Sequence, residues 1–460
     1  MTATIRSYSS HAPQWQRFQT QLMAPSHQVA AIAAKHQQPA VHPYQRQYAT
    51  VYHQRYTQLA PLCWQAFAAA EKQQEQEQQQ QGGNGDTVRH VSRILELSEG
   101  IVSVVVGTLV KEAVPDATDE PLVKGSECRA SDELFLEDDS GRVALECGTL
   151  KHQWPTGSVV AVQGTVGIDG TMRVERIYAP GSVTTALSNT PMRTDSTNNT
   201  DPCYLLCLSG LDCGNPAVPP TARELLLAFL QGRLNHPAAP RVSRVLVAGG
   251  WAMGTKPALQ DADGWLDNLL ATGIPCDILP SQADPTTANW PQRPLHRSLL
   301  PRSSRWATCH RTPNPYQATY GTDRHRDGDG VVVVATDGLN VRAQQSVTAL
   351  PTHPDSQDIA EGWEQPTPLQ VMRQHLEGCH LCPTGPSLVP TMPHAEQDPM
   401  VLPSQPRVYV TGGHEAFATR LAPNGTRLVA VPSFGATGIA VLIDLNTLNV
   451  QLLKFVDETE

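Results

Sequence analysis

Five short runs rich in β-branched residues, all between residues 88 and 183, most strongly constrain how this chain folds. Glycine-containing turns such as Asp138-Asp139-Ser140-Gly141 separate them. Short strands joined by tight turns predict a small Greek-key barrel, and an oligonucleotide-fold barrel is the best match. The runs span 101–110, 133–138, 143–147, 159–166 and 172–177.

The chain after residue 202 alternates strands of the buried type with helices. Runs at 204–210 and 244–250 flank an amphipathic helix at 221–232, and this order predicts parallel pairing. A short helix is expected at 265–271. Further strand-like runs lie at 276–280, 331–335, 408–411, 426–431 and 439–444. The pattern predicts an α/β layered domain, with polar or proline-rich surface loops at 353–361 and 382–405.

The N-terminal part has little apolar periodicity before residue 40, which predicts a disordered arm. From Tyr48 to Phe67, apolar residues recur near helical spacing, although Pro61 should kink the helix or split it in two. The expected organisation is a disordered arm (1–40), a helical segment with a Gln-rich linker (41–87), the barrel (88–183), a Ser/Thr-rich linker (184–201) and the α/β domain (202–460).

Charge and cysteine content limit the classes of function. The chain has 44 acidic and 34 basic residues and a formal net charge of −10, so we do not expect a surface built mainly to neutralise phosphate groups. Its ten cysteines, without an apolar signal segment, favour reduced thiols in the cytosol or nucleus. No apolar run reaches the length of a membrane span, so no membrane contact is expected.

The residues that follow the predicted strands decide whether the α/β domain is catalytic, because chemistry sits at the carboxyl ends of parallel strands. A two-metal phosphoesterase needs aspartate, histidine and asparagine there to hold two ions and a bridging hydroxide. Ser209-Gly210 and Gly249-Gly250 offer little to a cation. Only Asp284, His414 and Glu415 could ligate. We therefore expect no hydrolysis, and we expect Asp284 to be a turn residue that accepts backbone N–H groups.

A second group of potential ligands is rich in cysteine and histidine. It comprises His375, Cys379, His380, Cys382 and His394. Cys379 and Cys382 have C-x-x-C spacing, but one such pair without a second is weak support for zinc, and chance pairs are common among ten cysteines. The sequence also lacks a Walker-type phosphate loop, a G-x-S-x-G elbow and an H-E-x-x-H helix. We expect neither a metal nor a cofactor.

Seven segments together resemble one known family. They are Y-Q-R-Q-Y-A-T-V-Y at 44–52, D-E-L-F-L-E-D at 132–138, V-S-R-V-L-V-A-G at 242–249, P-C-D-I-L-P-S-Q-A-D-P-T at 275–286, P-Q-R-P-L-H at 291–296, N-P-Y-Q-A-T at 314–319 and V-P-S-F-G-A-T at 431–437. With these motifs the chain resembles the small (second, or B) subunit of eukaryotic DNA polymerase delta. The likeness extends from about residue 44 to the C-terminus.

The resemblance implies an oligonucleotide-fold barrel paired with an inactive calcineurin-like phosphoesterase domain. It also implies a non-catalytic scaffold subunit that acts in the nucleus, in DNA replication and repair. Such a scaffold bridges the C-terminal cysteine-rich module of the catalytic subunit to a third accessory subunit. DNA would then be contacted only indirectly.

On the same resemblance, the interface with the catalytic subunit includes the barrel and two loops of the phosphoesterase-like domain. The candidate partner-interface residues are Asp284, Pro285, Pro294, His296, Asn314 and Tyr316. Each residue taken singly could instead rigidify a turn against the core.

Two alternative functions are also compatible with the sequence. An active metal-dependent phosphoesterase would need unusual ligands such as Asp284, His310, Asp337 and His414. A single-strand nucleic-acid-binding module would stack bases on exposed aromatic residues of the barrel. Phe135 is the one aromatic residue within the five runs, and the acidic balance of the chain disfavours this use.

Overall fold

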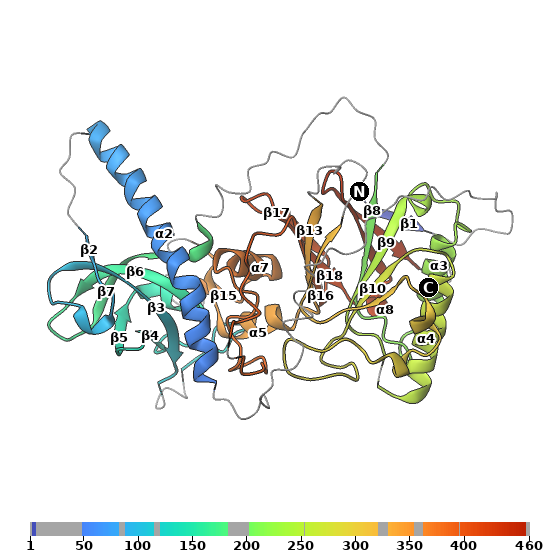
Figure 1. The fold of residues 1–460 in the computed structure, drawn as a ribbon, viewed down its shortest axis with the longest axis horizontal. Helices are drawn as coiled ribbons and strands as arrows, with labels where there is room; N and C mark the ends of the chain where they lie inside the picture. The colour runs from blue at the N-terminus through green and yellow to red at the C-terminus, as the bar shows by residue number, and fades with distance from the viewer. Residues whose placement is uncertain are drawn as a thin grey trace. The chain divides into compact units, whose positions relative to one another are not determined.

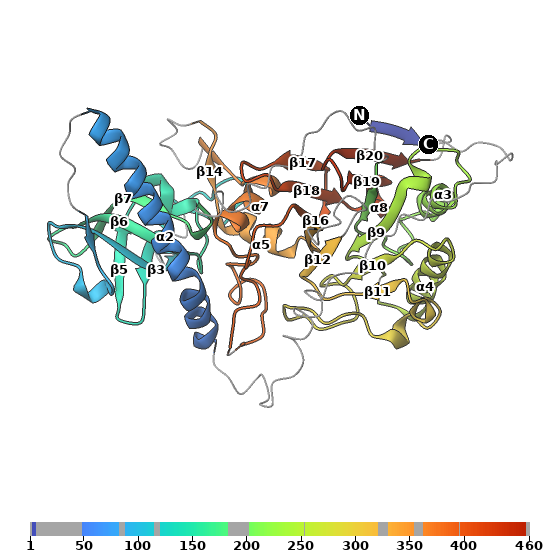
Figure 2. The same cartoon turned by 45° about the horizontal axis from the view of Figure 1, so that its top comes forward.

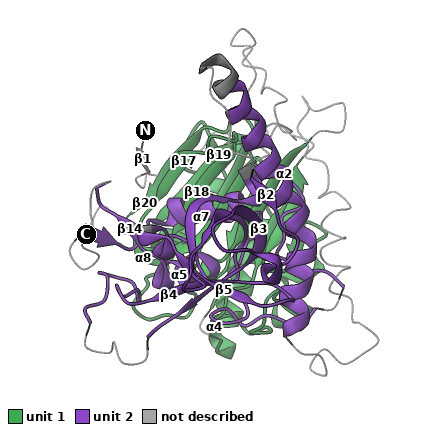
Figure 3. Ribbon diagram, turned by 90° about the vertical axis from the view of Figure 1, so that its left-hand side faces the viewer, with its two compact units in different colours: residues 1–38, 190–339, 406–460 green, residues 39–189, 340–405 purple. Residues whose placement is uncertain are grey.

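The chain is divided by its internal contacts into two compact units. The computed structural model describes residues 2–5, 48–81, 88–114, 120–182, 202–252, 254–320, 330–353, 362–394 and 396–456. Unit 1 comprises residues 1–38, 190–339 and 406–460, and unit 2 comprises residues 39–189 and 340–405 (Figure 3). Residues 340–405 therefore lie in unit 2, whereas the sequence pattern predicts that they belong to the α/β domain (202–460). The predicted linker and most of the predicted arm lie outside the described residues.

Unit 2 contains the small barrel that the sequence predicts. Strand β3 pairs with β6 through residues 102–108 and with β4 through residues 108–112. This double pairing closes the sheet into a barrel (Figure 1), whose core receives alternate residues of each strand. The strands are β2 (Arg89–His90), β3 (Val102–Glu112), β4 (Glu133–Glu137), β5 (Arg142–Glu146), β6 (Val159–Val166) and β7 (Met172–Tyr178).

One long helix, α2 (Ala49–Gln81), lies against the barrel. Leu59, Cys63 and Phe67 repeat every four residues along one face of α2 and pack on apolar residues of β3 and β6. The helix continues through Pro61 and does not split there. The Gln-rich segment after Phe67 extends the same helix (Figure 1).

The described residues of unit 1 form two β-sheets. The seven-stranded sheet has the order β1-β20-β19-β8-β9-β10-β11, and the five-stranded sheet has the order β12-β13-β16-β18-β17 (Figure 2). Strands β8 to β11 are parallel, as the strand–helix–strand order predicts. The strands are β1 (Thr2–Ile5), β8 (Tyr204–Leu208), β9 (Val242–Ala248), β10 (Cys276–Leu279), β11 (Cys309–Arg311), β12 (Tyr316–Tyr320), β13 (Val331–Thr336), β16 (Val408–His414), β17 (Ala418–Leu421), β18 (Arg427–Pro432), β19 (Ile439–Asp444) and β20 (Val450–Phe455).

Hydrophobic residues cover both faces of the seven-stranded sheet. Leu205 and Leu246 belong to the core shared with the five-stranded sheet. Their neighbours Leu206 and Val245 belong to the core shared with the helices, because successive side chains of a strand point to opposite faces. These helices are α3 (Thr221–Leu230), α4 (Lys256–Leu270) and the short α8 (Phe434–Thr437). Unit 1 is therefore a layered α/β structure.

Helix α4 begins earlier than the helix predicted at 265–271. It starts at Lys256, and Thr255 caps its first turn. The acidic residues in its first half interrupt the apolar periodicity that would predict a helix. One of them, Asp263, is buried and accepts a hydrogen bond from the backbone N–H of Ser303 over 2.9 Å. The expectation of a short helix was therefore wrong. A local pattern does not reveal that Asp263 can be buried, because its partner Ser303 lies 40 positions further along the chain.

The segment 382–405 is not the surface loop that its polar, proline-rich sequence predicts. Cys382, Val389 and Leu402 are buried, and the guanidinium of Arg55 binds the main-chain carbonyls of Pro383 and Gly385. A buried donor group satisfies the loop carbonyls in place of water. The predicted loop at 354–361 lies outside the described residues. The remaining elements of this part are α5 (Leu339–Val347), β14 (Leu350–Pro351), β15 (Trp363–Glu364) and α7 (Pro368–Glu377).

Across the described ranges, every helix is too short or too polar to cross a membrane.

Candidate functional site: the closed strand edge

The carboxyl ends of four strands of unit 1 are joined by hydrogen bonds between their loops. The N–H of Gly210, after β8, donates to the carbonyl of Gly249, after β9, over 3.0 Å. After β18, the N–H of Phe434 donates to the carbonyl of Ser209 over 2.6 Å, and that of Gly435 to Gly210 over 2.7 Å. We call this surface the closed edge. It comprises residues 209–210, 249–250, 412–414 and 433–435.

Glycine allows the loops of the closed edge to approach one another. A Cβ atom on Gly250 would lie 2.7 Å from the Cα of Gly210, and one on Gly412 would lie 2.4 Å from the carbonyl oxygen of Ala248. Both distances are shorter than a van der Waals contact with backbone atoms. The main chains of these loops therefore pack directly against one another.

Ser209 links the two sheets of unit 1 through its hydroxyl group. The Oγ donates to the carbonyl of Ala248 over 2.8 Å and accepts from the N–H of Gly413, at the end of β16, over 2.8 Å. Ser209 is 2% exposed. Its hydroxyl thus takes part in two hydrogen bonds inside the protein, and its role here is structural.

Asp284 fulfils the turn role that the sequence predicts. Its carboxylate accepts the backbone N–H groups of Gly250, Trp251 and Ser281 at 3.1, 2.9 and 2.8 Å. The N–H of Ala252 adds a longer hydrogen bond at 3.4 Å, and the Ser281 hydroxyl adds another at 2.8 Å. Burial raises the pKa of this carboxyl above its ordinary value, although these hydrogen bonds oppose the rise. The oxygen atoms are already used in tying the loop after β10 to the loop after β9.

The other ligands of the alternative phosphoesterase site have separate partners. His414 Nε2 lies 2.8 Å from Thr411 Oγ1, and His310 Nδ1 lies 2.8 Å from Asp277 Oδ1. The Asp337 Oδ1 accepts the N–H of Leu339. Glu415 is exposed. Within the described residues, none of the candidate ligands Asp284, His310, Asp337, His414 and Glu415 belongs to a group of three whose ligand atoms converge.

A buried network centred on Asp277 of β10 is not evident from the sequence pattern. Arg244 NH1 donates to Asp277 Oδ1 over 2.6 Å, and the hydroxyls of Tyr316 and Tyr320 donate to Oδ2 over 3.1 and 2.5 Å. Burial alone would raise the pKa of Asp277, but Arg244 and His310 outweigh it and hold the pKa below its usual range. One feature of the sequence could have indicated this network. Asp277 is a single carboxylate within the apolar strand at 276–279, and a buried charge requires a partner.

The six candidate interface residues differ in exposure. Asn314 and Tyr316 are 0% exposed, and the Asn314 amide donates to Gln292 Oε1 over 2.7 Å. Pro285 is half-buried, while Pro294 and His296 are exposed. Direct contact with a partner is therefore open to Pro294 and His296, and the buried residues can act only by shaping the loops. The interface role of this group stays a prediction.

The cysteine and histidine group at 375–394 does not converge on one point within the described residues. His380 Nε2 lies 2.9 Å from Asp398 Oδ2, and His375 Nε2 lies 3.1 Å from Gln344 Oε1. Cys379 and Cys382 are buried thiols. Each of these two imidazole rings therefore lies within hydrogen-bond distance of another side chain.

Two family models match the barrel and part of the chain that follows it. Residues 47–177 match the DNA polymerase delta subunit OB-fold domain, which confirms the predicted oligonucleotide-fold barrel. Residues 252–419 match the DNA polymerase alpha/epsilon B subunit family. The chain is thus a B-type, non-catalytic subunit of a DNA polymerase.

Individual relatives narrow the class to one family. DNA polymerase delta subunit 2 of Drosophila melanogaster is 30% identical over 357 residues, which cover 72% of this chain and 75% of the relative. The DNA polymerase delta small subunit of rice (Oryza sativa subsp. japonica) is 29% identical over 401 residues, with coverage of 79% and 86%. The chain belongs to the family of DNA polymerase delta small subunits.

Solved structures add only a remote likeness. Thermus thermophilus sulfate thiohydrolase SoxB in complex with glycerol is 11% identical with a TM-score of 0.27, and the match covers 56% of this chain and 57% of that one. A score this low supports no statement about the fold.

Proposed function

We propose that this chain is the scaffold of its DNA polymerase delta complex. It bridges the C-terminal cysteine-rich module of the catalytic subunit to a third accessory subunit, in nuclear DNA replication and repair. The observation that carries the proposal is the closed edge, where the backbones of Gly210 and Gly250 pack closely against each other. A layered unit without a reaction centre retains surfaces that can bind other polypeptides.

We further propose that unit 1 is an inactivated calcineurin-like phosphoesterase domain. Support comes from the parallel strands β8, β9 and β10, whose carboxyl ends carry the closed edge. The loop after β10 keeps one carboxylate, Asp284, and uses it for backbone hydrogen bonds. In this account a metal-binding edge has become a structural one.

The loop that carries Pro294 and His296 suits the proposed contact with the catalytic subunit. Two hydrogen bonds between residues 281 and 293 order this loop. The Thr286 hydroxyl donates to the carbonyl of Arg293 over 2.6 Å. The Gln292 amide donates to the carbonyl of Ser281 over 3.1 Å. A loop that is ordered before binding loses less conformational entropy when it docks. Pro294 and His296 are the exposed members of the candidate group on this loop.

Direct binding of single strands by the barrel is the less favoured function. Phe135 is 9% exposed, and the guanidinium of Arg142 lies 4.2 Å from its ring centroid. A base could stack on this ring only after displacing Arg142. We therefore propose that the barrel contacts protein, and that DNA is held by other subunits.

A three-component capture experiment tests the scaffold. The tagged third subunit should retain the cysteine-rich module of the catalytic subunit only when this chain is present. The variant His296→Glu should weaken retention of the module, while the exposed Arg233→Glu, as control, should not. Association of the two partners without this chain, or failure of the chain to bind either partner, would contradict the proposal.

A further inference from the structure

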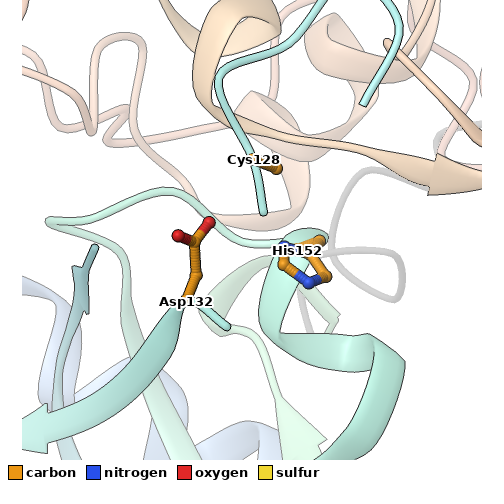
Figure 4. A group of neighbouring side chains, drawn as sticks. All are labelled: Cys128, Asp132 and His152. Carbon is orange, nitrogen blue, oxygen red and sulfur yellow. The ribbon is translucent and has the colours of Figure 1, made fainter. Parts of the chain in front are cut away.

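Three potential metal ligands of unit 2 come together from two segments of the chain. Cys128 lies in the loop before β4, Asp132 directly precedes β4, and His152 ends the 3-10 helix Gly148–His152. Their ligand atoms, one sulfur, one carboxylate oxygen and one imidazole nitrogen, all lie within 4.8 Å of one another (Figure 4). The exposed fractions are 1%, 5% and 0%.

His152 gives an independent indication of a missing ligand. Neither ring nitrogen has a hydrogen-bond partner, although the side chain is 0% exposed. The ring packs edge-on against Trp363, with centroids 5.7 Å apart. Burying two unpaired polar atoms against an apolar neighbour is unfavourable, and an absent ion is one of the few explanations for such a group.

We propose that Cys128, Asp132 and His152 form a binding site for a zinc-class divalent metal ion. A thiolate, an imidazole and a carboxylate are the ligands of Zn²⁺ and related ions, whereas Ca²⁺ and Mg²⁺ prefer oxygen ligands throughout. Three protein ligands leave one coordination position for water. The site is independent of the closed edge and of the proposed scaffold function.

A hydrogen bond fixes the carboxylate of the proposed site. Asp132 Oδ2 accepts the N–H of Arg129 over 2.9 Å, which orients the carboxylate and leaves its second oxygen to the ion.

Lys111 limits the affinity of the site. Its Nζ lies 3.6 Å from Cys128 Sγ and donates to the carbonyl of Val347 over 2.9 Å. An ammonium group beside the sulfur repels an incoming cation. Binding should therefore be weaker than at a four-cysteine zinc site. Replacing Lys111 by methionine should reduce the repulsion and tighten binding.

Cobalt titration of the full chain tests the proposal. Co²⁺ added to chelator-treated protein should give a thiolate-to-cobalt charge-transfer absorption that saturates at one equivalent. The band should be lost in Cys128→Ser and kept in Cys147→Ser, a control thiol in the same unit that also lies near Lys111 and Lys151. Absence of bound Co²⁺ in the wild-type chain, or an unchanged band in a folded Cys128→Ser variant, would overturn the proposal.

A second measurement needs no variant to fold. Zn²⁺ should slow the alkylation of Cys128 by about tenfold or more in mild denaturant, as read by peptide mass spectrometry, because a bound ion opposes local opening. The buried Cys382, outside the cluster, serves as the internal control. Equal alkylation rates of Cys128 with and without Zn²⁺ would contradict the site.

Discussion

The backbone N–H of Gly210 donates to the carbonyl of Gly249 over 3.0 Å and so joins the ends of two neighbouring parallel strands. In an enzyme of this architecture these ends carry ligands and stand apart around a substrate. Here they contact each other directly, and the next residue, Gly250, approaches Gly210 more closely than any side chain would allow. The edge is part of the packed structure of unit 1.

Replacing Gly250 of the closed edge by alanine should lower the free energy of unfolding by more than the strain of its backbone conformation accounts for. Gly250 has φ +72° and Gly254 has φ +68°, so alanine at either position costs about 1–2 kcal/mol of left-handed strain. At Gly254 the new Cβ meets nothing within 4 Å, whereas at Gly250 it meets backbone at 2.7 Å. Overpacking should add roughly 1–3 kcal/mol. Urea unfolding should show this difference, and equal losses for Gly250→Ala and Gly254→Ala would refute the close packing.

Asp277→Asn should lower the free energy of unfolding by about 3–5 kcal/mol, because it leaves the guanidinium of Arg244 buried without its counter-charge. Arg244 and Asp277 are 1% and 0% exposed. The matched control is Glu112→Gln, which removes the carboxylate from an exposed pair with Arg142. That change should cost no more than about 1 kcal/mol. Similar losses in the two variants would show that the Asp277 network contributes little.

Arg55→Lys keeps the charge and should still destabilise unit 2 by roughly 2–4 kcal/mol. The guanidinium donates to Asp398 and to the carbonyls of Gly157, Pro383 and Gly385, and a single ammonium nitrogen cannot reach all of these positions. Limited proteolysis should then cut within 383–398 more rapidly. Arg373→Lys, on the exposed face of α7, is the control and should change stability by less than about 0.5 kcal/mol. Unchanged proteolysis in Arg55→Lys would contradict this role.

Acid should destabilise unit 2 through two buried histidines. Burial, aided by neighbouring positive charge, lowers the pKa of His375 to about 3 and that of His380 to about 4, although Asp398 acts against the shift of His380. Both rings stay neutral in the folded chain while the unfolded chain takes up protons near pH 6.5, so stability falls as pH decreases from about 6.5 to 4. Each histidine contributes about 1.4 kcal/mol per pH unit within this window.

Substitution of His375 tests whether this residue causes the dependence of unfolding free energy on pH. His375→Gln should flatten the dependence of unfolding free energy on pH by about one proton. His296→Gln, an exposed control, should leave the slope unchanged. A slope in His375→Gln equal to that of the wild-type chain would show that His375 titrates alike in both states.

Local patterns predicted the barrel well because its strands are specified by neighbouring residues. The turn at 138–141 separates two apolar runs, and β4 and β5 pair across it. The same local reasoning identified Ser209 and Gly250 as poor ligands and Asp284 as a turn residue. These conclusions needed only residue types and their places after strands.

Long-range partners could not be read from the sequence. Arg55 and Asp398 are separated by 343 positions, and nothing near either residue reveals the other. A polar, proline-rich sequence such as 382–405 is exposed in most proteins, and here a buried guanidinium reverses that preference. The partners of Asp277 were missed for the same reason, since they lie on other strands. The meeting of His152 with Cys128 and Asp132 was missed as well, because His152 lies on another segment.

The most direct test of the account is a phosphodiester hydrolysis assay of the purified chain with Mn²⁺ or Mg²⁺. The closed edge predicts no turnover above the protein-free rate, in the wild-type chain and in Asp284→Ala alike. Metal-dependent turnover that disappears in Asp284→Ala would contradict the central claim that this edge has lost its reaction centre.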